Sequence, residues 1–103
     1  MAFVGHGSPM NAIEDNVWSR GFRDLGAALP HPAAILVVSA HWYTRGTAVT
    51  GNERPPTIHD FGGFPEPLYA VQYPAMGDVS FANRVADLIG RDSASIRLDW
   101  GLD

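Results

Sequence analysis

The chain has 103 residues, 46% of them hydrophobic and 17% charged, and a formal net charge of −4. This length allows one small domain at most, and the hydrophobic content argues against disorder. All seven basic residues are arginine and they form no cluster, which argues against nucleic acid as a partner. Because cysteine is absent, any metal ion must be held by His, Asp or Glu.

No apolar run reaches the length that crosses a membrane, and the chain does not begin with the basic segment of a signal peptide. We therefore expect no membrane partner. The lack of cysteine is also compatible with a reducing compartment, so we expect a cytoplasmic location.

The first elements predicted along the chain are a strand and a helix. Residues 2–5 are apolar and end abruptly at a glycine, which predicts a short buried strand. Asp15 or Asn16 can cap a helix that runs to about Leu29, where two prolines end it. The apolar residues of this helix recur at helical spacing and form one face: Trp18, Phe22, Leu25 and Leu29.

The apolar segment "AAILVVSAHW" at residues 33–42 is the strongest strand signal. Its β-branched run does not alternate with polar residues, as in a strand buried on both faces of a parallel sheet. We expect residues 35–38 to form an interior strand, parallel to residues 3–5 and next to them. The helix between the two strands then makes a βαβ crossover.

The second half continues the alternation of strands and helices. Residues 47–50 predict a short strand, and the Pro- and Gly-rich residues 52–67 predict a long loop, which is often functional. A helix is expected at residues 79–89, capped by Asp78 and ended by a glycine, and "SIRLDW" at residues 95–100 predicts another strand. The apolar residues of this helix recur at helical spacing and are expected to face inward: Val79, Ala82, Val85, Ala86 and Ile89. The predicted fold is α/β, with a mainly parallel sheet and flanking helices in one domain over residues 1–103.

The segment "GHGSPM" places His6 between two glycines, where the first strand ends. It lacks the third glycine of a dinucleotide fingerprint and the lysine of a phosphate-binding loop, so a metal ligand is the remaining interpretation. His41 ends the segment at residues 33–42 in the same way. Parallel strands end at one edge of a sheet, so His6 and His41 are predicted to hold one divalent ion together. For either histidine by itself we prefer an ordinary polar residue at a strand–loop junction, and only the matched positions of the two favour the metal.

The blocks "GHGSPMNAIEDN", "SAHWYTRG", "TIHDFGGFPEPLYAVQYPAMG" and "WGLD" resemble the class III extradiol ring-cleavage dioxygenases, in their 4,5-DOPA dioxygenase branch. The resemblance covers essentially the whole chain. It implies a catechol substrate, O₂ and a non-haem divalent metal, functionally Fe(II), with Zn(II) often in its place. The first two metal histidines of the family fall on His6 and His41.

The chain is also shorter than members of this family, which are over twice as long and supply a further metal ligand from their C-terminal half. We therefore expect residues 1–103 to be the N-terminal part of a larger single-domain fold. Such a part brings two metal ligands, is inactive by itself, and self-associates through uncovered apolar surface, which makes a homo-oligomer possible.

His59 lies in the long loop, which the resemblance places near the active site. It either orients the catechol and moves protons, or bonds to neighbouring backbone. Asp60 and Glu66 are either partners that fix a histidine tautomer or, as we prefer, solvated residues. The loop aromatics are expected to pack the loop rather than to bind substrate: Phe61, Phe64, Tyr69 and Tyr73.

Two minor expectations and two rival functions complete the interpretation. His31, between two prolines, is expected to be an exposed turn residue, and Trp42 to pack beneath the site. The first rival is a zinc hydrolase on a related α/β scaffold, in which the same histidines activate water. The second is a fragment without activity that only associates with another chain.

Overall fold

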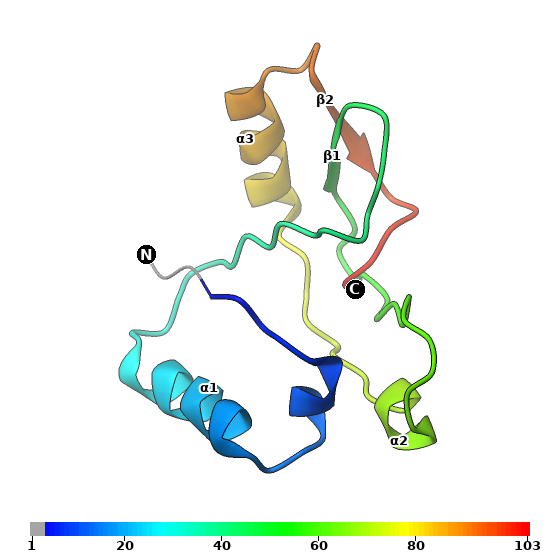
Figure 1. Cartoon of the computed structure of the whole chain (residues 1–103). Coiled ribbons are helices and arrows are strands. Elements are labelled where there is room, and N and C mark those ends of the chain that lie inside the picture. The colour runs from blue at the N-terminus through cyan, green and yellow to red at the C-terminus, as the bar shows by residue number, and fades with distance from the viewer. Residues whose placement is uncertain (1–3) are drawn as a thin grey trace. The chain divides into compact units, whose positions relative to one another are not determined.

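The computed structural model describes residues 4–103, which form two compact units (Figure 1). Unit 1 comprises the chain up to Ala33 together with Phe61–Val71, and unit 2 comprises Ala34–Asp60 and Gln72–Asp103. The element order along the chain is η1, α1, β1, α2, α3 and β2. Within the described residues, no helix is long and apolar enough to cross a membrane.

Unit 1 is helical and is held mainly by local caps. A 3-10 turn, η1 (Pro9–Ala12), follows Ser8, whose hydroxyl accepts a hydrogen bond from the Met10 amide. Helix α1 (Val17–Ala28) begins with a capping box, in which Asn16 and Ser19 satisfy each other's backbone amides. The predicted helix and its Asn16 cap are confirmed.

The apolar face predicted for α1 exists, but most of it stays in solvent. Trp18 is 68% exposed, and Leu25 and Leu29 are exposed as well. The core of unit 1 lies instead around the short helix α2 (Glu66–Tyr69), which packs against η1 and buries Leu68 to 2% exposure. Helix α1 therefore forms with a capping box at its start and without much burial of its apolar side.

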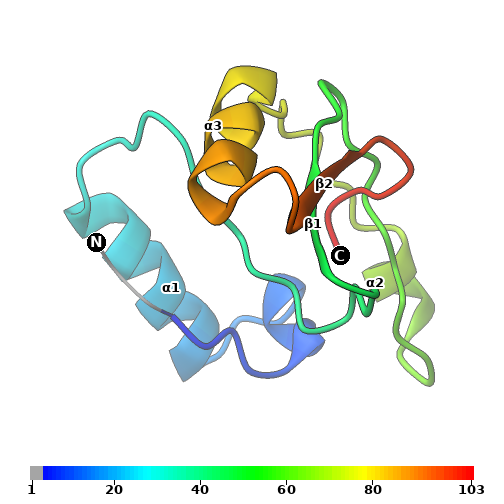
Figure 2. The same cartoon turned by 90° about the horizontal axis from the view of Figure 1, so that it is seen from above.

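Unit 2 contains the sheet, and the elements predicted at residues 47–50, 79–89 and 95–100 are confirmed, the last as a strand at Ala94–Arg97. Strand β1 (Thr47–Thr50) pairs in parallel with β2 (Ala94–Arg97), with Thr47 opposite Ala94. Helix α3 (Val79–Ile89) starts at Asp78, whose carboxylate accepts from the Phe81 amide at 2.8 Å. The helix packs on both strands, so β1, α3 and β2 form a parallel crossover (Figure 2).

Small side chains let α3 lie close to the sheet. Ala82 and Ala86 of the helix and Ala94 of β2 are all buried, Ala86 completely. The predicted inward face of α3 is thus confirmed at its two alanines, whereas Ile89 at its end is exposed. The observed architecture is a small α/β fold with a parallel pair of strands.

The prediction of an interior strand at residues 35–38 is wrong. This segment forms no strand, and Ile35, Leu36, Val37 and Val38 are 69%, 58%, 63% and 85% exposed. A strand needs a hydrogen-bonding neighbour. Of the predicted neighbour, residues 2 and 3 lie outside the described residues, and the described Val4 and Gly5 are not in a strand. The predicted crossover from residues 2–5 to residues 33–42 is therefore not observed.

Candidate functional site

Three segments of unit 2 that are distant in sequence meet around His41. The amide of Ile58 donates to the Leu102 carbonyl at 2.6 Å, and the Leu102 amide donates to the Pro56 carbonyl at 2.8 Å. The indole rings of Trp42 and Trp100 stack with centroids 5.6 Å apart and planes inclined by 3°. We call the group formed by these segments the His41 cluster; its members are Ser39, His41, Trp42, Asp60, Trp100 and Asp103.

The backbone of His41 is fixed by a serine-centred turn. The amides of His41 and Trp42 donate to the Ser39 hydroxyl oxygen at 3.0 and 3.1 Å. The same hydroxyl donates its proton to the Asp103 carboxylate. The turn before the imidazole is therefore anchored to the last segment of the chain.

The His41 imidazole has one polar partner and one open nitrogen. Its Nδ1 lies 2.9 Å from Oδ2 of Asp60, and the His41 side chain is 50% exposed. Among residues 4–103, no side chain or backbone group bonds its Nε2. Our preference for a merely solvated Asp60 is thus wrong, because the Ile58–Leu102 pairing places this carboxylate beside the ring.

Gly101 allows residues 100–103 to lie close to residues 56–58. A Cβ atom on Gly101 would lie 1.9 Å from the Pro56 carbonyl oxygen, a distance that no side chain tolerates. The buried Gly101 therefore lets the flanking residues pair with residues 56–58. The motif "WGLD" thus has a structural requirement for its glycine that no local sequence signal indicated.

His6 lies in unit 1, beside η1. Its side chain lines a hollow of about 260 Å³ with Ser8, Pro9, Asn11, Ala12 and Phe22. The His6 carbonyl accepts from Nδ2 of Asn11 at 3.1 Å, and Oδ1 of Asn11 accepts from the α1 cap Asn16 at 3.1 Å. Asn11, which the sequence interpretation missed, therefore ties the segment that carries His6 to the start of α1.

The two predicted metal ligands belong to different compact units. A metal site shared by His6 and His41 therefore stays a prediction. Residues 4–103 contain no group of three or more His, Asp or Glu side chains arranged to hold a metal ion. His59 is half-buried in unit 2, next in sequence to Asp60, and its role also stays a prediction.

The other predicted residues fall outside the His41 cluster. His31 is exposed, as expected, and Glu66 lies in the first turn of α2. Phe61 packs edge-on against Phe64, with ring centroids 5.3 Å apart, and its ring is tilted by 44° against that of Tyr69, with centroids 5.2 Å apart. These three aromatics therefore pack on one another within unit 1.

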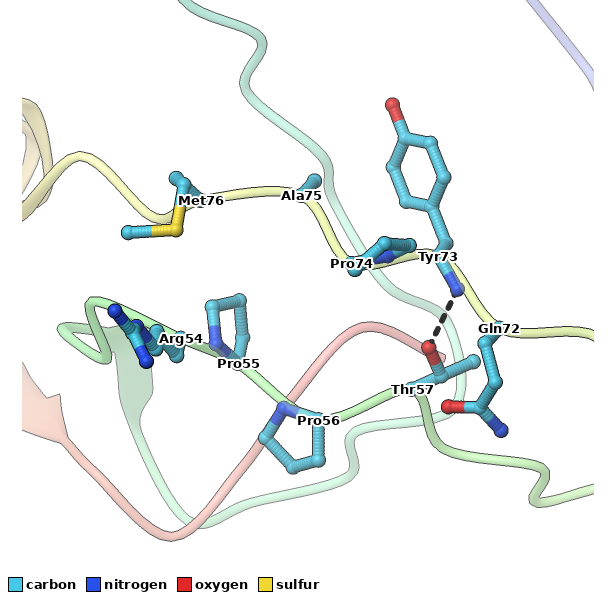
Figure 3. Close-up of a pocket in the computed structure, with 9 residues that line it drawn as sticks. All are labelled: Arg54, Pro55, Pro56, Thr57, Gln72, Tyr73, Pro74, Ala75 and Met76. Carbon is cyan, nitrogen blue, oxygen red and sulfur yellow. Dashed lines mark hydrogen bonds between the residues drawn. The ribbon is translucent and has the colours of Figure 1, made fainter.

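Tyr73 has a different environment in unit 2. Its amide donates to the Thr57 hydroxyl at 2.9 Å, and the residue lines a hollow of about 360 Å³ (Figure 3). Two stretches of chain form this hollow, residues 54–57 on one side and residues 72–76 on the other. Arg54 is the one charged residue that lines it, and the hollow includes no member of the His41 cluster.

Comparisons with known proteins show which proteins this chain is similar to. No family model matches the chain. The chain is 54% identical, over 102 residues, to the 4,5-DOPA dioxygenase extradiol of Escherichia coli (strain K12), covering 98% of this chain and 38% of that protein. It is 41% identical to the protein of the same name from Beta vulgaris and 33% identical to that from Mirabilis jalapa, each covering 98% of this chain and 40% of the relative.

The resemblance found in the motifs is therefore confirmed. The chain is homologous to extradiol dioxygenases along nearly its whole length. Within that class, its relatives carry the name 4,5-DOPA dioxygenase extradiol. The chain spans about two fifths of the length of these curated relatives.

Proposed function

We propose that this chain supplies two metal-ligating histidines, His6 and His41, to an enzyme that opens a catechol ring of the DOPA type with O₂. The observation that carries the proposal is the His41 cluster. It brings together three of the sequence blocks that resemble extradiol dioxygenases, from residues 39–42, 57–60 and 100–103. The names of the relatives support the same reaction.

The donor set suits the expected metal. Imidazole nitrogens bind Fe(II) and Zn(II) well, and Nε2 of His41 is open while the Asp60 carboxylate occupies the other ring nitrogen. His6 and His41 would hold the ion, and a further ligand would come from residues outside this chain. When bound, a divalent metal of this kind supplies the Lewis acidity and the electron transfer that couple a catechol to O₂.

The residues of this chain would then prepare the site around the ion. Ser39 and Asp103 fix the backbone that carries His41, and the stacked Trp42 and Trp100 give the cluster a rigid, apolar side. We assign to His59 the removal of a catechol proton, because a neutral imidazole is a suitable base near neutral pH and His59 adjoins Asp60. Catechol and O₂ are the proposed partners, and self-association of this chain remains part of the proposal.

A chimera tests the function directly. In the Escherichia coli relative, the aligned 102 residues are replaced by this chain, and the Fe(II)-loaded protein is given DOPA in an oxygen electrode. We expect O₂ uptake equal to the DOPA consumed, with a yellow ring-opened product. The variants His6→Ala and His41→Ala should lose it, whereas His31→Ala, at an exposed turn, should keep it.

Two results would contradict the proposed function. One is a chimera with the circular dichroism of the parent enzyme that consumes no O₂ with DOPA. The other is a His41→Ala chimera that reacts at the unaltered rate. Amide hydrolysis by the Zn(II)-loaded chimera in the absence of O₂ would support the rival hydrolase instead.

A further inference from the structure

We infer that Asp60 is a positioning residue for His41: it holds the proton of the neutral imidazole on Nδ1 and so leaves Nε2 as the nitrogen that can bind a metal. The tautomer follows from the geometry of the chain by itself. Only its use in binding a metal rests on the proposed function.

The chemistry of the contact determines where the proton lies. Nδ1 of His41 is 2.9 Å from Oδ2 of Asp60, a normal hydrogen-bond distance. An ionised carboxylate has no proton to donate, so Nδ1 must be the donor. A neutral imidazole carries one N–H only, and Nε2 is then an unprotonated acceptor with a free lone pair.

The two partners are held by separate anchors. Asp60 follows the pairing of Ile58 with Leu102, and His41 follows the turn that Ser39 makes with Asp103. The first anchor ends at Leu102 and the second at the next residue, Asp103. The contact therefore does not depend on a chance meeting of two flexible surface side chains, although the two residues are 19 positions apart.

The exposure of the His41 and Asp60 side chains agrees with their separate anchoring. The Asp60 side chain is 23% exposed, and that of His41 is 50% exposed. The carboxylate is thus the more enclosed partner, and the imidazole keeps half of its surface accessible. The other carboxylate of the cluster, on Asp103, is engaged by the Ser39 hydroxyl, so Asp60 is the carboxylate that acts on the ring.

The tautomer can be measured in the chain without any metal. A two-bond ¹H–¹⁵N correlation spectrum of the ¹⁵N-labelled chain separates a protonated ring nitrogen from an unprotonated one. It is recorded at increasing pH until the ring nitrogen shifts no longer change, so that a single protonation state is compared. We expect Nδ1 of His41 to show the shift of a protonated nitrogen and Nε2 that of an unprotonated nitrogen.

Substitutions show whether Asp60 is the cause. Asp60→Ala removes the carboxylate that accepts from Nδ1. His41 should then move toward the tautomer with its proton on Nε2. Glu66→Gln is the matched control, because it removes a carboxylate in unit 1. It should leave the ¹⁵N shifts of the His41 ring nitrogens unchanged. His31, which is exposed, serves as an internal reference in every spectrum.

A second readout links the tautomer to metal binding. Zn(II) titration of the chain should show an affinity at His41 that is about 10- to 100-fold weaker in Asp60→Ala, the loss typical of such outer partners. An unprotonated Nδ1 in the unaltered chain would overturn the inference, even if the variants failed to fold. Unchanged ¹⁵N shifts of the His41 ring nitrogens in folded Asp60→Ala would also overturn the inference. Neither result bears on O₂ uptake by the chimera, which tests the proposed function separately.

Discussion

The two units of the chain are stabilised in different ways. Unit 2 is held by contacts between distant segments: the β1–β2 pair, the hydrogen bonds of Leu102 with residues 56–58, and the bond from the Thr50 hydroxyl to the Trp100 carbonyl. Unit 1 relies largely on neighbouring residues, such as the Asn16 capping box. Its largest helix leaves Trp18 and two leucines in solvent. The His41 cluster lies in unit 2, where pairing between distant segments holds it in place.

The largest expected effect is that of Gly101→Ala on unit 2. The new Cβ would collide with the Pro56 carbonyl oxygen at 1.9 Å, and backbone cannot move aside as a side chain can. We expect a loss of about 3 kcal/mol in the free energy of unfolding, at the upper end for overpacking. Hydrogen exchange at the Ile58 and Leu102 amides should report it.

The matched control for this change is Gly21→Ala in α1. No atom lies within 4 Å of the Cβ that it would add, and Gly21 does not have a positive φ. This variant should gain about 0.5–1 kcal/mol through helix propensity. Equal effects of the two glycine substitutions would contradict the difference between the units.

Leu68→Ala should be the strongest single change in unit 1. Leu68 is 2% exposed and is the buried residue of α2. We expect a loss of about 2 kcal/mol, the low end for a buried leucine, because a four-residue helix can relax around the cavity. Urea denaturation measures it. Leu88→Ala, at a residue that is 79% exposed in α3, should change stability by less than about 0.5 kcal/mol.

The N-cap residues of α1 and α3 allow the same kind of substitution to be compared in the two units. Asn16→Ala removes the capping box of α1, and Asp78→Ala removes the cap of α3. Each should cost about 1 kcal/mol. The Asn16 change should reduce helical circular dichroism locally, whereas the Asp78 change should also weaken protection of the β1–β2 amides, because α3 packs on both strands. Unaltered strand protection in Asp78→Ala would show that α3 does not support the sheet.

The smallest expected effect is a pH dependence in unit 2. The hydrogen bond from Arg97 lowers the pKa of Asp99, and that from Arg91 lowers the pKa of Asp87. A carboxyl pKa that is lower in the folded state stabilises the fold above the ordinary value of about 3.9, and this contribution is lost as pH falls through the folded pKa. The stability difference between the unaltered chain and Arg97→Gln should thus be small and should shrink below that pH. A difference that grew in acid would contradict the assignment.

Local signals in the sequence predicted most of the helices and strands. Asn16 and Asp78 as caps, the apolar spacing of residues 79–89 and the β-branched residues 47–50 all led to elements that exist. Two short elements, η1 and α2, were missed, although each has a proline in its first turn, which is a known starting signal. Such short helices form through tertiary contacts that single-sequence patterns do not contain.

The errors arose because the sequence does not show which segments contact one another; the secondary structure that each segment favours was not their cause. The apolar run at residues 35–38 indicates a segment suited to burial, but it does not indicate what would cover it, and in this chain it stays exposed. The Asp60–His41 contact was missed for a related reason. It depends on how residues 56–58 pair with Leu102, and a pairing across more than 40 positions leaves no periodic trace in the sequence.

The central claim is that His6 and His41 hold one divalent ion together. The most direct measurement is a Zn(II) titration of the chain, followed by the ring ¹⁵N shifts of both histidines, in the unaltered chain and in His41→Ala. The account predicts that both rings respond with one common midpoint, and that His41→Ala weakens the response of His6 by more than tenfold. A His6 response that is unchanged in His41→Ala would contradict the shared site.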